Sequence, residues 1–383
     1  MRLRPIPALV QSCSLLVVMS ILIACGSGGS SLTTVTNPPP QPTELLYAAT
    51  LAGQVATQKI DTNTGTLSSA AVSTGSNGVS ITLNPAGTFL YAADLSSNAI
   101  DAFSISSTGT LSTMSGSPFS APGSGGINGV TIDTTGRFLY ASGTTASGGT
   151  GTGIIAVFSI DSATGALSPV TGSPFAAGTS SGQLMVDPSG HLYVGDANGG
   201  VLASSTSSGV ITPIAGSPFP SGSRGLAITP NGKYLYAIDV STVVTAYTID
   251  PSSGSLTQVS GSPFLEPTGG AFSGRVIVDP KGKFLYVYNT FGQVTISGLA
   301  IDDSTGALSV STGSPFAAVQ STLFAANMAI EPSGKFLYAS CSDGTCGILA
   351  FSIDATSGAL TPVTGSPFNA ANYVGGMAPL RLQ

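Results

Sequence analysis

The phrase Gly87-Thr88-Phe89-Leu90-Tyr91 recurs along most of the chain and decides its fold. Four further copies keep five residues, one is a residue shorter, and a Leu-Leu-Tyr segment supplies the first: Gly136–Tyr140, Gly232–Tyr236, Gly282–Tyr286, Gly334–Tyr338, Gly190–Tyr193 and Leu45–Tyr47. The seven tyrosines that end these copies stand 43 to 53 residues apart. A period of roughly 40–50 residues, with several short strands in each copy, is typical of propeller blades.

Each repeat orders its strands and turns in the same way. An apolar strand such as Gly225–Ile228 precedes the tyrosine strand, and a third strand such as Ala156–Ile160 follows it. An Asp-x-x-x-Gly-x-Leu turn, as at Asp161–Leu167, leads to an outer strand that ends in Gly-Ser-Pro-Phe, as at 116–119. Asp can bind the turn backbone, Gly tolerates positive φ, and Pro suits an outer strand. We expect the Phe to wedge between neighbouring blades.

The two ends of the repeat region complement each other. The first repeat begins at its second strand, Glu44–Thr50, whereas the C-terminal Gly375–Ala378 aligns with the innermost strand segment Ala326–Ala329. The last strand would therefore complete the first blade and remove the open edge of a linear array. The sequence predicts an all-β, seven-bladed β-propeller over residues 44–383, with four-stranded antiparallel blades and the first blade closed by the C-terminal strand.

The N-terminal residues are typical of an export signal. Arg2 and Arg4 precede an apolar run that ends in Leu22-Ile23-Ala24-Cys25. A basic start, a short apolar stretch and a small-residue cleavage site favour a signal peptide over residues 1–24. The final four residues resemble the lipobox of bacterial lipoproteins, in which Cys25 would carry the lipid; a plain secretory signal with an incidental cysteine is the alternative.

A flexible connection is expected between this anchor and the propeller. Residues 25–43 are rich in Gly, Ser and then Pro, which is typical of a tether. Residue 26 is Gly rather than Asp, so the inner-membrane retention signal of enteric bacteria is absent. We therefore expect a lipid-anchored protein of the bacterial cell envelope, at the outer membrane, facing the periplasm or the surface.

The composition excludes several classes of partner. Only 7% of residues are charged, the net charge is −6, and hydrophobic residues make up 42%. The apolar runs of the repeats are too short to span a bilayer, and Lys and Arg do not cluster there. We expect no nucleic-acid partner, membrane contact through the N-terminal lipid only, and a monomer, since a closed propeller hides its own edges.

Two cysteines remain in the predicted propeller. Cys341 and Cys346 bracket an Asp343-Gly344 hairpin turn. In such a hairpin they would face each other as a non-hydrogen-bonded pair with Cα atoms ~4.5 Å apart, which is within disulfide range. Export to an oxidising compartment favours a disulfide over the alternative of two free thiols. Further metal ligands are missing from this segment, and we predict neither a metal site nor a cofactor.

The repeated phrases also carry a family resemblance. The Pro-x-Gly-[Lys/Arg]-Phe-Leu-Tyr strand, followed by Phe-x-Ile-Asp-x-x-Thr-Gly-x-Leu, resembles the seven-bladed lactonase family, which includes 6-phosphogluconolactonase-like and muconate cycloisomerase-like proteins. The resemblance covers residues 44 to 383. It implies a channel-mouth site in which His, Arg and Glu lie where innermost strands enter the central channel, in phrases such as Gly-Pro-Arg-His-Leu-Ala.

This chain departs from that phrase. Its matching stretch is Ser223–Ala227, in which Arg224 is kept and Gly225 replaces the His. His191, the one histidine of the sequence, occupies the Lys/Arg/Thr position of its repeat, on a turn expected to face solvent far from the mouth. We expect a structural role for it. Neither His nor a carboxylate stands at the same register in the other blades, which holds Ser80, Gly129, Gln183, Arg275, Asn327 and Gly376.

The predicted mouth is thus a neutral, hydrogen-bonding ring with two cations. Arg224 and Arg275 lie on adjacent blades, with Asn128, Gln183 and Asn327 nearby in register. Two guanidinium groups suit a carboxylate, a phosphate or an acidic sugar. The alternative is that the arginines brace neighbouring loops through backbone carbonyls.

Two functions follow from these features. The first is a non-catalytic envelope propeller that binds a small acidic or sugar-like ligand, or an envelope protein, at its channel mouth. The alternative, which rests on the resemblance, is a lactone hydrolase of the 6-phosphogluconolactonase type. Such an enzyme would be a metal-independent lactonase acting on a carboxylic ester ring, with no catalytic residue assigned. Export does not suit a phosphorylated cytosolic substrate.

The lipid anchor can be tested directly. Cys25→Ser removes the only thiol that a lipobox could modify, so the variant is expected in the soluble periplasmic fraction while the wild type sediments with membranes. Fractionation followed by immunoblotting measures this difference. Continued membrane partition of the variant would contradict the lipoprotein prediction.

Overall fold

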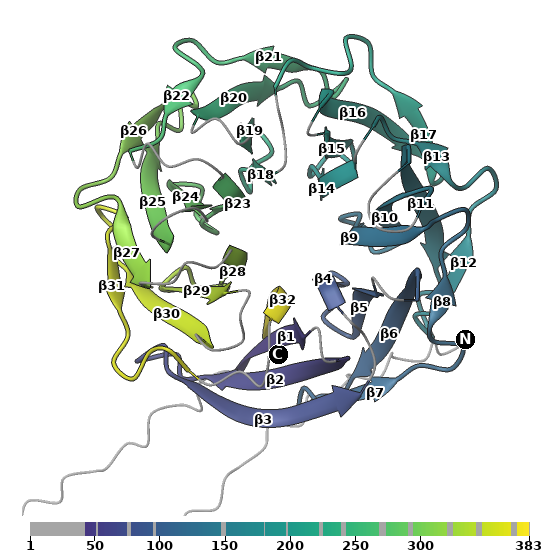
Figure 1. The fold of residues 1–383 in the computed structure, drawn as a ribbon, viewed down its shortest axis with the longest axis horizontal. Helices are drawn as coiled ribbons and strands as arrows, with labels where there is room; N and C mark the ends of the chain where they lie inside the picture. The colour runs from purple at the N-terminus through teal and green to yellow at the C-terminus, as the bar shows by residue number, and fades with distance from the viewer. Residues whose placement is uncertain are drawn as a thin grey trace, which may run out of the picture. The chain divides into compact units, whose positions relative to one another are not determined.

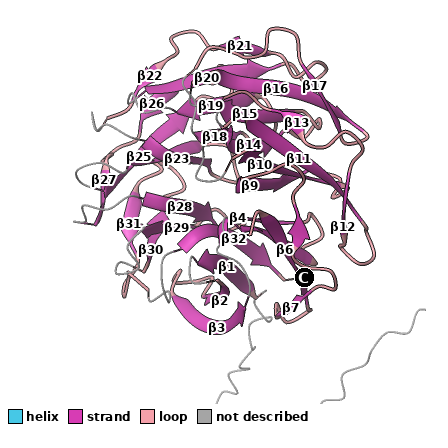
Figure 2. Cartoon of the chain, turned by 45° about the vertical axis from the view of Figure 1, so that its right-hand side comes forward, coloured by secondary structure: helices cyan, strands magenta, loops and turns pink. Residues whose placement is uncertain are grey.

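The repeats form seven antiparallel blades around a central axis (Figure 1). The computed structural model describes residues 43–382 except 51–52, 75–77, 95–96, 147–150, 180, 197, 222–224, 239–242, 268–272, 290–293, 320–324, 342–346 and 369–373. All described elements are strands, joined by turns and loops (Figure 2). None of the elements in these ranges is a helix long and apolar enough to cross a membrane. The predicted fold is confirmed.

The strands of the first three blades, from the innermost outward, are these. Blade 1 contains β32 (Val374–Arg381), β1 (Glu44–Thr50), β2 (Gln54–Ile60) and β3 (Leu67–Thr74). Blade 2 contains β4 (Gly78–Leu83), β5 (Phe89–Asp94), β6 (Ala99–Ile105), β7 (Leu111–Thr113) and the short β8 (Phe119–Ser120). Blade 3 contains β9 (Gly126–Ile132), β10 (Phe138–Thr144), β11 (Gly153–Ile160), β12 (Leu167–Pro169) and the short β13 (Phe175–Ala176).

The remaining four blades follow the same plan. Blade 4 contains β14 (Ser181–Val186), β15 (Leu192–Asp196), β16 (Gly200–Ser207) and β17 (Val210–Pro213). Blade 5 contains β18 (Gly225–Ile228), β19 (Tyr234–Ile238), β20 (Val243–Ile249), β21 (Leu256–Gln258) and β22 (Phe264–Leu265). Blade 6 contains β23 (Ser273–Val278), β24 (Phe284–Asn289), β25 (Val294–Ile301), β26 (Leu308–Val310) and β27 (Phe316–Val319). Blade 7 contains β28 (Ala325–Ile330), β29 (Phe336–Cys341), β30 (Ile348–Ile353) and β31 (Leu360–Pro362).

The C-terminal strand closes the first blade, as the sequence predicts. β32 pairs with β1 along its whole length, from Glu44 opposite Arg381 to Thr50 opposite Val374. The amide of Leu382 also donates to the carbonyl of Thr43, at 2.9 Å. The ring therefore joins its two chain ends through backbone hydrogen bonds, with no open edge between blades 1 and 7.

The blade tyrosines join each blade to the next. Each of these side chains is fully buried, and burial raises the pKa of Tyr47 to about 12, so the hydroxyls stay protonated. In six blades the hydroxyl donates to a glycine carbonyl in the turn between third and outer strands of the next blade. The pairs are Tyr47–Gly109 (2.8 Å), Tyr91–Gly165 (2.7 Å), Tyr193–Gly254 (2.9 Å), Tyr236–Gly306 (3.1 Å), Tyr286–Gly358 (2.9 Å) and Tyr338–Gly65 (3.1 Å).

The same turn glycine also receives the side chain that lies two residues before each blade tyrosine. At Gly165, φ is +73° and a Cβ would lie 2.7 Å from the ring of Phe89. Glycine is therefore required there both by its backbone conformation and by the approaching ring. This contact occurs in all seven blades: Leu45–Gly109, Phe89–Gly165, Phe138–Gly209, His191–Gly254, Tyr234–Gly306, Phe284–Gly358 and Phe336–Gly65.

Blade 4 breaks the hydrogen-bond pattern, because its turn is shorter. Ser207 pairs with Val210, so only Ser208 and Gly209 connect the strands, both with positive φ. This two-residue hairpin lacks the Asp-x-x-x-Gly turn of blades 1, 3, 5, 6 and 7. Tyr140 of blade 3 approaches Thr206, but its buried hydroxyl has no hydrogen-bond partner among the described residues.

The Gly-Ser-Pro-Phe segments close each blade at its outer side. In six blades the serine hydroxyl accepts a hydrogen bond from a third-strand amide, as Ser117 does from Ala102 at 2.9 Å. The phenylalanine packs against a cluster shared by two blades, as Phe119 does against residues of blades 2 and 3. The predicted wedge is confirmed. Blade 1 lacks this segment, and its outer strand β3 pairs with β2 over its whole length instead.

The inter-blade tyrosine bond can be measured against an internal control. Tyr236→Phe removes one buried hydrogen bond and is expected to lower the free energy of unfolding by about 1 kcal/mol. Tyr140→Phe removes a hydroxyl without a partner and is expected to be neutral or slightly stabilising. Urea unfolding of the two variants and the wild type tests the difference, and equal destabilisation by both substitutions would contradict it.

Candidate functional site

The innermost strands surround the central axis (Figure 1). The face at which they begin is called the channel mouth. The predicted mouth register is confirmed, because in six blades its residue pairs with the residue two after the blade tyrosine. These pairs are Ser80–Ala93, Gly129–Ser142, Gly225–Ile238, Arg275–Tyr288, Asn327–Ser340 and Gly376–Ala49. In blade 4, Gln183 lies within an irregularity between Ser181 and Leu184.

A β-bulge accompanies this register in most blades. The pairing shifts between Gly78 and Ser80 in blade 2, and Asn128 is the extra residue beside Gly129 in blade 3. The innermost strands of blades 4, 6, 7 and 1 shift at the same level. Bulges re-aim side chains and are common beside functional sites. The backbone of the mouth is thus irregular in the same place around the ring, which local sequence did not predict.

Two predicted ligand-binding amides join neighbouring blades. The Gln183 side-chain oxygen accepts from the amide of Leu226 in blade 5, at 3.2 Å. The Asn327 side-chain nitrogen donates to the carbonyl of Gly375 in blade 1, at 3.0 Å. Ser80 accepts from the amide of Val130 in blade 3 in the same way, at 3.3 Å. These three polar side chains thus brace neighbouring blades. The sequence left this role open for the arginines.

Only one of the two predicted arginines, Arg275, lies in the described part of the chain. Arg275 is half-buried on β23, directly opposite Tyr288, and follows the bulge of blade 6. Arg224 lies outside the described residues, so the expected arginine pair stays a prediction. Asn128 is half-buried on β9.

A buried carboxylate at the mouth was missed. Glu266 is 6% exposed and directly follows β22, whose Leu265 pairs with Val243, the first residue of β20. The third strands start at the mouth, so Glu266 lies at this end of blade 5. The same register after Gly-Ser-Pro-Phe holds Ala121 and Ala177 in blades 2 and 3. The acidic residue at a position that holds alanine in these repeats is the sequence signal that could have identified Glu266.

Two other carboxylates at this face serve the loops. Asp196, which is 1% exposed, accepts from the amide of Thr179 at 2.8 Å, from its hydroxyl at 2.9 Å, and from the amide of Asn198 at 3.1 Å. Asp94 at the same register accepts from the hydroxyl of Ser97, at 2.7 Å. Both end the tyrosine strand and stabilise the turn after it.

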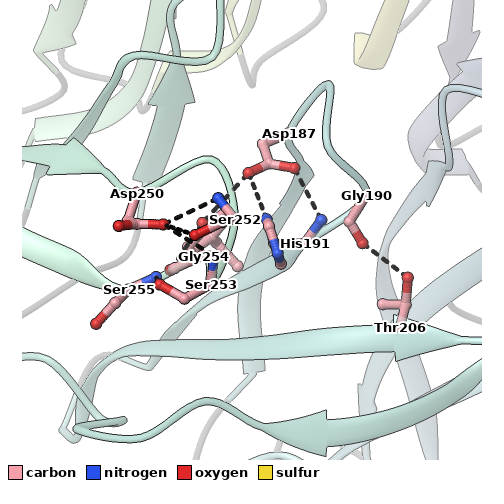
Figure 3. A network of polar contacts seen from close by, with 10 residues as sticks. Asp187, Gly190, His191, Thr206, Asp250, Ser252, Ser253, Gly254 and Ser255 are labelled. Atoms are coloured by element: carbon pink, nitrogen blue, oxygen red, sulfur yellow. Dashed lines mark hydrogen bonds and ion pairs between the residues drawn. The ribbon is translucent and has the colours of Figure 1, made fainter.

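His191 is placed differently from the prediction. Counting back from Tyr193 puts it at the Phe position of the repeat, because the preceding turn is one residue shorter. It is buried, 8% exposed, its Nδ1 lies 2.9 Å from an Asp187 carboxylate oxygen, and its ring packs on Gly254 (Figure 3). The expectation of a solvent-facing side chain was wrong. Its ring replaces a phenylalanine, and it lies at the face opposite the mouth.

The acidic residues of the opposite face stabilise turns, as predicted. Asp279 accepts from the amides of Lys283 and Phe284, at 2.6 and 2.7 Å. Asp250 accepts from the hydroxyl and amide of Ser252, at 2.6 and 2.9 Å. The Ser252 hydroxyl and the turn amides lower the pKa of Asp250 to about 2. Asp250 is therefore an ionised turn cap rather than a proton donor.

The cysteine predictions stay open. Cys25, the Cys341 side chain and Cys346 lie outside the described residues, so neither the lipid site nor the disulfide is tested. Within the described part of the chain, no group of three or more His, Cys, Asp and Glu side chains is placed to hold a metal ion.

Comparison with known sequences finds a family match over part of the chain. The model of the family "Lactonase, 7-bladed beta-propeller" matches residues 212–374, and the tyrosine strands before residue 212 repeat the same phrase. That part of the chain is therefore similar in sequence to the lactonase family, and the described residues as a whole form a seven-bladed β-propeller. No curated protein matches the sequence significantly.

Solved structures share the fold of this propeller at low sequence identity. A proposed 6-phosphogluconolactonase from Bacteroides uniformis is 21% identical, with a TM-score of 0.75 over 89% of this chain and 100% of that one. Another, from Bacteroides fragilis, is 19% identical, with a TM-score of 0.73 over 90% and 99%. A periplasmic gluconolactonase from Pseudomonas aeruginosa is 16% identical, with a TM-score of 0.67 over 89% and 99%.

The buried position of His191 predicts how substitutions there change the stability of the fold. His191→Phe restores the residue that four other blades have there and is expected to fold with little change in stability. His191→Ala leaves a cavity against Gly254 and is expected to cost about 2 kcal/mol or more. Thermal and urea unfolding measure both, and a His191→Ala variant as stable as the wild type would contradict the buried position.

Proposed function

We propose that this propeller is a lactone hydrolase whose substrate binds at the channel mouth. The family match and the gluconolactonase names of similar structures support this reaction class. The site is supported by the order of the chain at this connection, since the buried Glu266 ends blade 5 and Arg275 is on the first strand of blade 6. A guanidinium can bind a lactone carbonyl or carboxylate, and a carboxylate can act as a general base.

The proposed reaction adds water across the ester bond of the ring. Arg275 binds the carbonyl oxygen and stabilises the negative charge that develops on it. Glu266 accepts a proton from the attacking water, whose oxygen bonds to the carbonyl carbon. The ring C–O bond then breaks, and the ring oxygen takes up that proton to give the open hydroxy acid. Arg224, if it lies beside Arg275, would bind an acidic group of the substrate.

The proposed substrate is an extracytoplasmic sugar lactone. The signal-like residues 1–24 and the Leu22–Cys25 lipobox support export and lipid anchoring in the cell envelope, where phosphorylated cytosolic sugars are scarce. The similarity in fold to a periplasmic gluconolactonase is consistent with such a compartment. The Cys341–Cys346 disulfide proposed for the blade 7 hairpin would also form there.

A second function is favoured by the amide contacts. Gln183 and Asn327 join blades, and the mouth register holds neither His nor a carboxylate. Both features suit a propeller that binds an acidic or sugar-like ligand, or an envelope protein, without turning it over. Activity measurements separate this binding function from hydrolysis.

Glu266→Gln and Arg275→Ala test the proposed site. With δ-gluconolactone and its 6-phosphate as probes, Glu266→Gln is expected to lower kcat about 10²-fold or more, because it removes the base. Arg275→Ala is expected to lower kcat/KM by about 10²-fold. Lys283→Ala is the matched control, because it removes an exposed cation from the opposite face of the same blade. Acid release in a pH-stat measures all four proteins.

Two outcomes would contradict hydrolysis at this site. If the wild type opens neither lactone above background but binds gluconate by calorimetry, the binding function holds. If hydrolysis is present and survives both substitutions, the active site lies elsewhere.

A further inference from the structure

Two buried carboxyl groups meet where the ring closes. Glu44, the first residue of β1, is 2% exposed, and Glu331, in the turn after β28, is 1% exposed. Their side chains lie within hydrogen-bonding reach of each other across the seam between blades 1 and 7. In the other five-residue repeats the position of Glu44 holds an exposed, uncharged or basic residue: Thr88, Arg137, Lys233, Lys283 and Lys335. The buried acid is particular to the closing blade.

Glu331 accepts four hydrogen bonds from its own turn. Its two oxygens accept from the amide of Ser333 (2.6 Å), the hydroxyl of Ser333 (2.8 Å), and the amides of Lys335 (2.5 Å) and Phe336 (3.0 Å). Four donors stabilise an ionised carboxylate. Glu44 has Arg381 nearby, with Nε 3.7 Å from a carboxylate oxygen and an exposed side chain. Two adjacent buried carboxylates do not both ionise at low cost, so the proton belongs on Glu44.

Blade 1 lacks the covalent turn that joins the inner and second strands in the other six blades. At this end, β32 is held to β1 by the pairing of Arg381 with Glu44 and by the Leu382–Thr43 hydrogen bond. We propose that Glu44 and Glu331 share one proton and form a pH-sensitive clasp on the C-terminal strand. Deprotonation of Glu44 would place two negative charges at the seam and loosen β32.

The other charged groups at the seam leave Glu44 as the group that titrates. Arg381 from β32 and Lys335 from blade 7 lower the pKa of Glu44, but burial, which is the larger effect, and the charge of Glu331 raise it. Tyr338 of β29 stays neutral because burial raises its pKa. Asp61, after β2, stays ionised because turn amides lower its pKa.

The direction of the pH effect follows from linkage. A carboxyl group whose pKa is raised by folding contributes stability below its unfolded value, near 4.5, and loses it as pH rises through the folded value. The clasp is therefore tightest in acid and loosens towards neutral and alkaline pH.

Hydrogen exchange of β32 in the full-length protein tests the clasp. Between pH 5 and 8, and corrected for intrinsic exchange rates, the protection of β32 is expected to fall by up to tenfold per pH unit until the pH reaches the folded pKa of Glu44, and to level off above it. Glu44→Gln is expected to remove this dependence, because its amide donates to Glu331 at every pH. Asp279→Asn is the control: it changes the equivalent turn of blade 6 and should keep the wild-type profile.

A second variant keeps the test decisive if Glu44→Gln fails to fold. Arg381→Gln removes the charge that favours ionised Glu44, so the loss of protection is expected at higher pH. A purely structural arginine would lower protection equally at all pH values. A wild-type profile without pH dependence, or one that Glu44→Gln leaves unchanged, would overturn the proposal.

Discussion

The propeller depends on one repeated contact, in which the second strand of a blade inserts two side chains against the turn glycine of the next blade. The tyrosine hydroxyl donates to that glycine's carbonyl, and the residue two positions earlier covers its Cα. Each hydrogen bond contributes only about 1 kcal/mol, but the contact links every blade to its neighbour. The tyrosine strand and the Asp-x-x-x-Gly turn recur together because they are two halves of this contact.

This contact separates the roles of the two faces. The turn glycines, the capping aspartates and His191 all lie at the face opposite the mouth, where the polar groups form hydrogen bonds within turns or between blades. The mouth face carries the bulges and the residues that differ from blade to blade. Variation among otherwise similar repeats is therefore concentrated where a ligand could be recognised, and Glu266 and Arg275 are part of that variation.

The candidate site was predicted less completely than the fold. Its register was correct, because counting from the blade tyrosine aligns all inner strands. The roles of Gln183 and Asn327 were not predicted, since an amide at a mouth position can bind a ligand or the adjacent backbone with equal chemistry. Glu266 was missed because its burial depends on how the blade 5 segment returns to the mouth, which no strand pattern shows.

By itself, the sequence determined the number of blades, the order of their strands and the closure by the C-terminal strand. Strand alternation and turn chemistry depend on local sequence, and the same pattern occurs in each repeat. Only the tertiary structure decided that His191 is buried on Gly254 and that Glu44 meets Glu331. These contacts join residues from different blades, and in the second case residues that lie near opposite ends of the repeat sequence. Their environment exists only once the ring has closed, so no local pattern encodes it.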